Sequence, residues 1–228
     1  MASSPPRVGT LRERPLHAAL KRWYAEPGDL VEHPVDGFVI DLVRDGLLIE
    51  IQTRSFASMK RKLAALLPDH PVRVVHPIAS DCWILKRDDQ GAVLSRRLSP
   101  KHGKAVDVVA ELVSLPTALL ESGFTLDVLL VQQEEVRHHE SGRAWRRRGW
   151  VVDERRLLAV TNRVTIESPA DLAGLLPQGL PEQFTTADLA TALSRPRRLA
   201  QQMTYCLRRV GQVAEVSRNG NAIVYTRV

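Results

Sequence analysis

Two carboxylates and an amide stand at spacings that suit a metal site on a pair of β-strands. Asp41 lies in one β-rich run, and Glu50 and Gln52 lie in the next, with Asp45-Gly46 between the runs. An Asp-Gly pair flanked by alternating apolar residues is a strong signal for a two-residue hairpin turn. Counting outward from that turn places Asp41 opposite Glu50, and strand alternation places Gln52 on the same face.

Two carboxylates that face each other across a hairpin repel and destabilise it. Apolar neighbours such as Val39, Val43 and Leu48 strengthen the repulsion, because water screens it less there. A hard divalent cation offsets this cost, and Mg²⁺ typically binds one or two carboxylates while keeping waters for a phosphate substrate. The alternative is an acidic pair on an open, solvated sheet face, neutralised by nearby Lys or Arg. The opposite face is predicted to form the core, and it carries Phe38, Ile40, Leu42, Ile49 and Ile51.

Helical and strand-like patterns alternate around this hairpin. The expected helices cover residues 16–25, 55–67 and 106–120, the last with a break at Pro116. The expected strands beyond the hairpin are 71–78, a second hairpin of 83–86 and 92–94, then 126–136 and 155–164. This order predicts a fold of the α/β or α+β class, with a mixed sheet flanked by helices.

The run from Asp41 to Glu50-Ile51-Gln52 resembles the motif of the PD-(D/E)xK nuclease superfamily, which includes restriction endonucleases and Holliday-junction resolvases. The order of helix, hairpin, helix and hydrophobic strand over residues 16–78 matches as well. The resemblance implies a restriction-endonuclease-like fold in which Asp41, Glu50 and the backbone carbonyl of Ile51 hold Mg²⁺ or Mn²⁺. Such a metal polarises the scissile phosphate and lowers the pKa of an attacking water.

Gln52 departs from the superfamily pattern, which usually has Lys at this place. Glutamine can hydrogen-bond a water or a phosphate oxygen, but it supplies no positive charge. Lys60 or Lys62 on the following helix would relocate that charge; alternatively, the substitution marks a weakened or lost activity. Glu32, just before the first hairpin strand, is expected to act as an accessory carboxylate.

The net charge of +6 favours polyanionic partners, and the arginines cluster in two regions. Arginine forks suit phosphates, and a neighbouring Trp can stack on a base. The first region is a basic loop that carries Arg143, Trp145, Arg146, Arg147 and Arg148. Its alternative interpretation is a solvated turn whose Trp residues fill the core.

The second basic region belongs to residues 166–228, where helix, turn, helix and β-hairpin follow in the order of a winged helix-turn-helix module. Arg195, Arg197 and Arg198 open the second of these helices, and Arg218 lies on the wing. Winged helices also serve as protein–protein modules, which is the competing interpretation. We expect three parts: a flexible arm (1–15), a nuclease-like domain (16–165) and this winged-helix-like domain (166–228).

The sequence therefore predicts a Mg²⁺-dependent DNA endonuclease that a winged helix positions on its substrate. A catalytically weak or inactive DNA-binding regulator on a nuclease scaffold is one alternative, and an RNA-directed or defence nuclease is another. Cutting both strands of a duplex favours a homodimer. The N-terminus lacks the apolar segment of a secretory signal, no apolar run reaches membrane-spanning length, and Cys82 and Cys206 stand alone. We expect a cytoplasmic protein without a membrane partner.

Overall fold

The structure is a computed structural model in which residues 14–228 are described. Most of the predicted N-terminal arm (1–15) lies outside these residues, and the first helix, α1, covers Pro15–Tyr24. Its observed bounds confirm the helix predicted over 16–25, and Pro15 at its first position suits a helix start. None of the helices within residues 14–228 has the length and apolar character needed to span a membrane.

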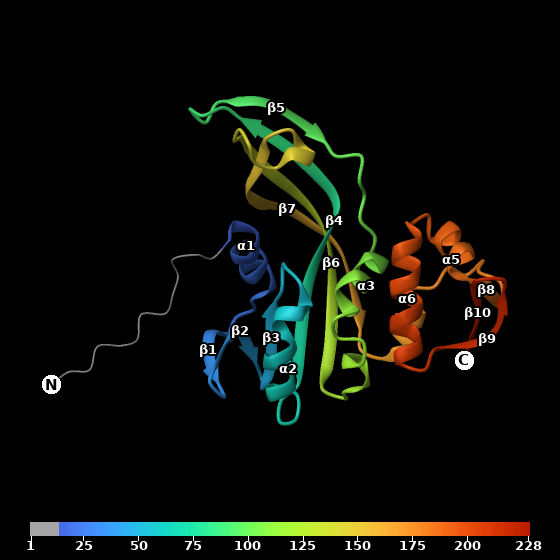
Figure 1. Ribbon diagram of the computed structural model, residues 1–228. Coiled ribbons are helices and arrows are strands. Elements are labelled where there is room, and N and C mark those ends of the chain that lie inside the picture. The colour runs from blue at the N-terminus through green and yellow to red at the C-terminus, as the bar shows by residue number, and fades with distance from the viewer. Residues whose placement is uncertain (1–13) are drawn as a thin grey trace.

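A seven-stranded mixed sheet forms the centre of the molecule (Figure 1). Its order is β1-β2-β3-β4-β6-β7, and β5 pairs with β4. The β3–β4 and β4–β6 pairs are parallel, and the other pairs are antiparallel. The strands are β1 (Leu30–Val35), β2 (Phe38–Arg44), β3 (Leu47–Ile51), β4 (Val72–Arg87), β5 (Val93–Leu98), β6 (Phe124–His139) and β7 (Trp150–Ile166).

The hairpin of β2 and β3 has the predicted turn and register. Asp45 and Gly46 have φ angles of 48° and 84°, as a type I′ turn requires of its two central residues. Val43 stands opposite Leu48, and Leu42 stands opposite Ile49. The regular pairing ends there, so the carboxylates lie where the two strands begin to separate.

Both faces of the sheet are buried, so the expectation of a single core face for this hairpin is wrong. One apolar cluster contains Leu42, Ile49 and Ile51 together with α1 residues such as Leu20. A second cluster contains Ile40, which was predicted to share a face with Leu42. The alternation breaks between Ile40 and Leu42, at the point where β2 begins to pair with β3.

Short helices cover the second face of the sheet. The predicted helix 55–67 is confirmed as η2 (Phe56–Met59) and α2 (Lys60–Leu66). The predicted helix 106–120 is instead three short pieces, η3 (Ala105–Val108), α3 (Val109–Leu112) and η4 (Ala118–Leu120). Pro116 ends the helical run, and the β-branched valines around residue 109 are weak helix formers.

Three strands are much longer than predicted. The strand expected over 71–78 and the first strand of the second hairpin form one continuous β4 of 16 residues. β6 has 16 residues and β7 has 17, and β-bulges interrupt their pairing. The far halves of these strands and β5 form a curved projection, which we call the arm and define as residues 81–98 and 132–157 (Figure 1).

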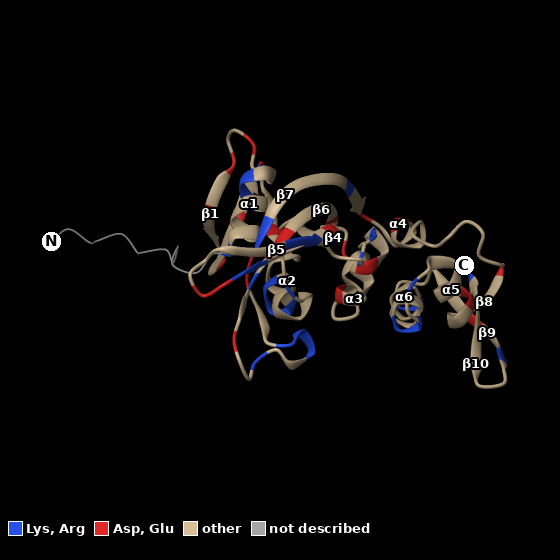
Figure 2. Ribbon diagram, turned by 90° about the horizontal axis from the view of Figure 1, so that it is seen from above, with Lys and Arg blue, Asp and Glu red and all other residues tan. Residues whose placement is uncertain are grey.

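The C-terminal part begins after β7 and packs on α3 (Figure 2). Its elements are α4 (Pro169–Ala173), β8 (Gln183–Thr185), α5 (Thr186–Leu193), α6 (Arg197–Arg209), β9 (Val213–Asn219) and β10 (Ala222–Arg227). The last strands form a three-stranded sheet of order β8-β10-β9. Thr185 accepts hydrogen bonds from the backbone amides of Ala187 and Asp188 and thereby caps the N-terminus of α5. Leu112 of α3 and Met203 of α6 belong to one apolar cluster, so the core is continuous.

Candidate metal centre

The carboxylates Asp41 and Glu50 come together where β2 and β3 part. In a continued antiparallel ladder, the Ile51 amide would donate to a backbone carbonyl of β2. It donates instead to Asp41 Oδ2, at 2.8 Å. Asp41 thus holds the end of the hairpin open, and its charge acts on the neighbouring Glu50.

Of the two acids, Glu50 has the ionised form that its surroundings disfavour more. Burial raises its pKa, and the charge of Asp41 raises it further, although Lys62 partly opposes both effects. Lys62 Nζ donates to the Glu50 carboxylate and to the backbone carbonyl of Val39, the latter at 2.7 Å. Of the two lysines predicted to relocate a positive charge, Lys62 therefore lies at the acids, whereas Lys60 is exposed at the start of α2.

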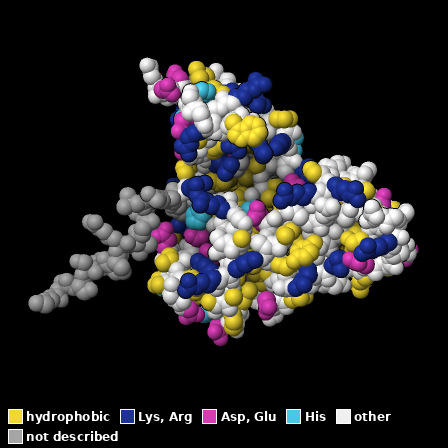
Figure 3. All heavy atoms as spheres, viewed as in Figure 1, with side chains coloured by type: hydrophobic (Ala, Val, Ile, Leu, Met, Phe, Trp, Pro, Cys, Tyr) yellow, Lys and Arg dark blue, Asp and Glu magenta, His cyan; other side chains and the backbone are white. Residues whose placement is uncertain are grey.

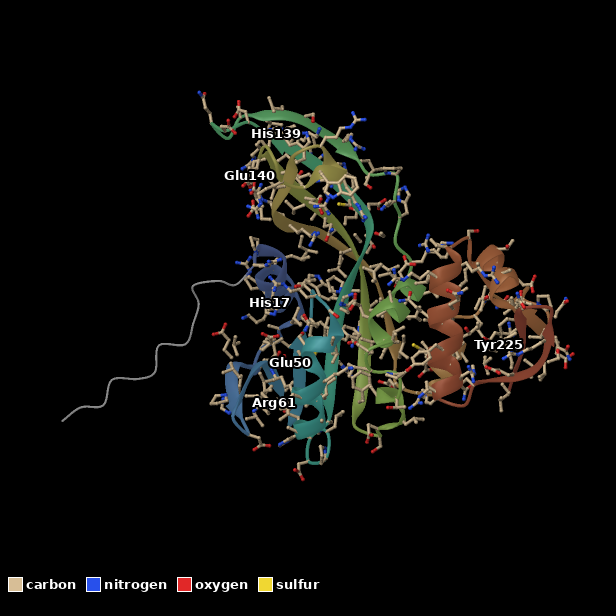
Figure 4. All side chains as sticks on the ribbon, viewed as in Figure 1. His17, Glu50, Arg61, His139, Glu140 and Tyr225 are labelled. Atoms are coloured by element: carbon tan, nitrogen blue, oxygen red, sulfur yellow. The ribbon has the colours of Figure 1, made fainter. Side chains whose placement is uncertain are left out.

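Helix α1 places two basic side chains, His17 and Lys21, near the acids, and neither was predicted to lie there; Figure 4 labels His17 on this helix. His17 Nε2 lies 3.3 Å from Asp41 Oδ2, and Lys21 Nζ donates to Glu32 Oε1 at 2.7 Å. Burial raises the pKa of Asp41, but His17, the Ile51 amide and Lys21 together hold it below its usual value. The spacing of His17 and Lys21 could have indicated that they act together, because residues four apart share one face of a helix.

Glu32, the predicted accessory carboxylate, lies on β1, the neighbour of β2 in the sheet, and its carboxylate is paired with Lys21. Val31 pairs with Leu42 and His33 with Ile40, so the register places Glu32 opposite Asp41. Glu32 also has a φ of 50°, a conformation uncommon for a residue with a side chain. The backbone of β1 is therefore locally distorted at Glu32, opposite Asp41.

Gln52 is ordered by the segment that follows β3. Its side chain donates to Ser58 Oγ at 3.1 Å and accepts from the Arg54 amide at 3.0 Å. Its backbone carbonyl accepts from His76 Nδ1 at 2.6 Å. Burial lowers the pKa of His76, whose ring packs edge-on against Phe56. The amide of Gln52 is therefore fixed in place by its neighbours.

The donor set around Asp41 fits a hard cation such as Mg²⁺. Two carboxylates and a nearby backbone carbonyl are all oxygen donors, and Mg²⁺ commonly keeps several waters in addition. Within residues 14–228, no three His, Cys, Asp or Glu side chains are grouped closely enough to form a metal site by themselves. Waters or substrate oxygens would have to complete the coordination, and Lys62 occupies the Glu50 side of the pair.

The predicted basic loop lies at the end of the arm. Arg143 is paired with Glu140 at 3.0 Å, and Trp145 is 80% exposed, so the interpretation that this Trp fills the core is wrong. Arg146 stacks over Trp145, Arg147 is exposed, and Arg148 has a φ of 51°.

The predicted basic residues of the C-terminal part are divided in their contacts. Arg195 makes a two-point contact with Asp107 at 2.8 and 2.9 Å and thereby ties the turn between α5 and α6 to η3. Arg197 and Arg198 are exposed at the start of α6, and Arg218 is exposed on β9. One residue of each basic region, Arg147 of the loop and Arg195 of the C-terminal part, lines the same hollow of the surface (Figure 3).

Comparison with known proteins matches the chain to relatives without an assigned activity. Residues 14–167 match the family model described as "Domain of unknown function (DUF8091)". A protein of Treponema pallidum (strain Nichols), described as uncharacterized, is 30% identical over 223 residues, which cover 96% of this chain and 87% of that protein. No solved structure matches.

Proposed function

The chain belongs to the DUF8091 family, and we propose that it is a Mg²⁺-dependent endonuclease that hydrolyses phosphodiester bonds of DNA. The observation that carries the proposal is the pairing of Asp41 with Glu50 at the parting of β2 and β3, on a mixed sheet flanked by helices. A costly pair of half-buried acids is what a cation-dependent phosphodiesterase requires. The similarity to the restriction-endonuclease-like fold is part of this proposal.

Each residue of the centre has a proposed task. Asp41, Glu50 and the Ile51 carbonyl hold the cation, which, when bound, activates a water and polarises the scissile phosphate. His17 orients Asp41 through its contact at 3.3 Å. Lys62 supplies the positive charge that Gln52 lacks, by turning from Glu50 to a phosphate oxygen, and Gln52 hydrogen-bonds the water or the phosphate.

Two further features belong to the same proposal. Glu32 adds a third carboxylate from β1, opposite Asp41 in the strand register. Lys60, exposed on α2 beside Lys62, contacts the phosphate backbone. Mn²⁺ replaces Mg²⁺ in this site, because both cations accept oxygen ligands.

The C-terminal part is proposed to be a winged helix-turn-helix module that places the enzyme on DNA. Its support is the order β8, α5, α6, β9, β10 and the turn between the two helices. α6 would be the recognition helix, with Arg197 and Arg198 exposed at its start and Arg218 on the adjoining hairpin. Cutting both strands would use two copies of the chain. The free thiols of Cys82 and Cys206 favour a reducing cytoplasm.

A second candidate is a DNA-binding regulator that keeps the nuclease scaffold without its activity. The observation in its favour is Gln52, which lacks the usual positive charge and whose amide is already hydrogen-bonded by Ser58 and Arg54. A nuclease directed at RNA would use the same centre on a different substrate.

Cleavage of labelled single- and double-stranded DNA and RNA, with Mg²⁺, Mn²⁺ or EDTA, tests the proposal. We expect cutting that requires the metal, that is lost in Asp41→Ala and that persists in Asp69→Ala, a matched exposed acid after α2. If DNA is bound but neither metal supports cutting by the wild type, the regulator replaces the nuclease. If RNA alone is cut, the substrate is RNA instead of DNA, and the assignment of Asp41 and Glu50 as the cation-binding acids remains.

A further inference from the structure

A cavity of about 870 Å³ lies between the arm and the C-terminal part. It is bounded by β4 and β6 of the arm, by the segment between β5 and η3, and by the start of α6. We propose that this cavity binds the phosphodiester backbone of a single nucleic-acid strand and leads that strand toward the metal centre. The inference rests on the proposed nuclease function and adds the form of its substrate.

The cavity is rich in positive charge. Five Lys or Arg side chains line it against two acids, which leaves three more cations than anions. The cations are Arg97, Lys101, Arg137, Arg147 and Arg195, and the acids are Asp107 and Glu135. Figure 3 shows Lys and Arg side chains along both sides of this hollow. Such a surface concentrates polyanions.

Three of these cations are available to a ligand. Arg137 is held by Glu135, and Arg195 is held by Asp107. Within residues 14–228, the structure gives Arg97, Lys101 and Arg147 no ion pair with an acid. The two arginines that are paired with acids form part of the cavity wall. The charge of the other three cations faces the cavity, where a bound anion would neutralise it.

A second cavity of about 500 Å³ continues the first toward the metal centre. The two share Ala79, Glu135 and Arg147 in their linings. The second cavity is also lined by residues 53–55, which directly follow Gln52. The second cavity carries equal numbers of acidic and basic side chains, so it attracts a polyanion less than the first. The first cavity therefore anchors the strand, and the second is the path that the strand follows.

The size and the aromatic content favour a single strand. Cavities of roughly 300 to 1,000 Å³ accommodate small molecules, so a few nucleotides of one strand fit here and a duplex does not. Trp145 lies two residues from Arg147 and is 80% exposed. An exposed indole this close in the chain to a cavity-lining arginine offers a surface on which an unpaired base can stack.

Fluorescence anisotropy with labelled single-stranded DNA, single-stranded RNA and duplex DNA, in EDTA and over a range of salt, measures this binding. The test variant is Lys101→Gln/Arg147→Gln, and the matched control is Arg22→Gln/Arg61→Gln, two exposed arginines outside the cavity. We expect the test variant to bind single strands about tenfold more weakly. Its log–log salt slope should fall by about 1.4, because each lost contact to a single strand contributes about 0.7. The control should match the wild type.

Two further measurements keep the inference separable from folding and from the nuclease proposal. Lys101→Arg/Arg147→Lys should retain binding, which distinguishes lost charge from lost structure. If Lys101→Gln/Arg147→Gln binds single strands with wild-type affinity, the proposal that the cavity binds a single strand is wrong, even if metal-dependent cutting is intact and the nuclease proposal stands. Tighter binding of duplex than of single strands, with the same loss in the variant, overturns the single-strand assignment. If the variant shows the expected loss of binding but the wild type cuts no substrate, the strand-binding cavity is supported and the nuclease proposal fails.

Discussion

Replacing Lys62 with methionine removes the cation that holds Glu50. The two side chains are 18% and 12% exposed, so water screens the remaining carboxylate poorly. Breaking a buried ion pair costs about 3–5 kcal/mol. Because the site retains some exposure and burial already raises the pKa of Glu50, which can take up a proton, we expect a loss of about 2 kcal/mol in EDTA. For a chain of this size, that lowers Tm by about 4–8 °C.

The same substitution should increase the stabilising effect of Mg²⁺. In the wild type, Lys62 competes with a cation for the Glu50 carboxylate. Without Lys62, the cation meets two unneutralised acids, Asp41 and Glu50. A ligand present at 100 times its Kd stabilises the folded state by about 2.7 kcal/mol. Saturating Mg²⁺ should therefore restore most of the stability lost in Lys62→Met.

Urea unfolding with and without Mg²⁺ measures both effects, and Lys60→Met, an exposed neighbour on α2, is the matched control. A Lys62→Met protein that unfolds at the wild-type midpoint in EDTA would show that the ion pair does not stabilise the fold. Mg²⁺ stabilisation no larger in Lys62→Met than in Lys60→Met would refute the view of Asp41 and Glu50 as a cation site. The double variant Glu50→Gln/Lys62→Met should recover stability in EDTA, because no charge is left unpaired.

Three further predictions concern the scaffold. Burial raises the pKa of Glu135, but Arg137 and Arg155 hold that pKa below its usual 4.5. The ionised Glu135 therefore stabilises the fold at pH values above 4.5, and this contribution is lost as the pH falls through the lowered pKa. Glu135→Gln should therefore cost about 1.5–3 kcal/mol at pH 7 and almost nothing once the pH is well below that lowered pKa, and a difference in urea midpoint that does not change with pH contradicts this. Gly103→Ala would place a Cβ 2.5 Å from the Ala79 carbonyl oxygen, so we expect a loss of about 1–3 kcal/mol in thermal unfolding, whereas Gly179→Ala, which meets open space, should be neutral. Leu207→Ala should cost about 2–5 kcal/mol and keep one transition by circular dichroism and by Trp fluorescence, because α6 shares its core with α3; two separate transitions would mean two separate cores.

The hairpin was predictable because its information is local. Asp45-Gly46 fixes the turn, and the turn fixes the register as far as Leu42 opposite Ile49. Beyond that point, contacts between distant segments decide the structure. The capture of the Ile51 amide by Asp41 ends the ladder, and no local pattern announces it.

Lys62 was predicted as a relocated positive charge, but the two basic side chains that α1 contributes were not predictable in the same way. Helical periodicity puts His17 and Lys21 on one face of α1, but it does not say which face of the sheet that helix covers. The strand β1 was missed for a related reason, since Pro34 and the distorted Glu32 disturb its alternation.

The arm was the largest feature that the sequence did not reveal. Polar residues such as Ser80 and Asp81 indicated the end of a strand, yet β4 continues through them. It does so because β6 accompanies it on one side and β5 replaces β3 on the other. Strand length is set here by partners far along the chain, which single-segment patterns do not report.

The continuous pairing of β4 with β6 also restricts how the arm can vary in length. β6 contributes Glu135 and Arg137 to the cavity wall, and β4 contributes Cys82 and Ile84, in each case residues two apart that share one face. Deleting one residue from either strand before these positions would reverse every outer side chain and turn the charged wall away from the hollow. Insertions or deletions of two residues would preserve that face. The arm can therefore grow or shorten in steps of two residues per strand and keep the charge of the cavity, whereas a single residue needs a further β-bulge like the one at Ala79 and Asp81.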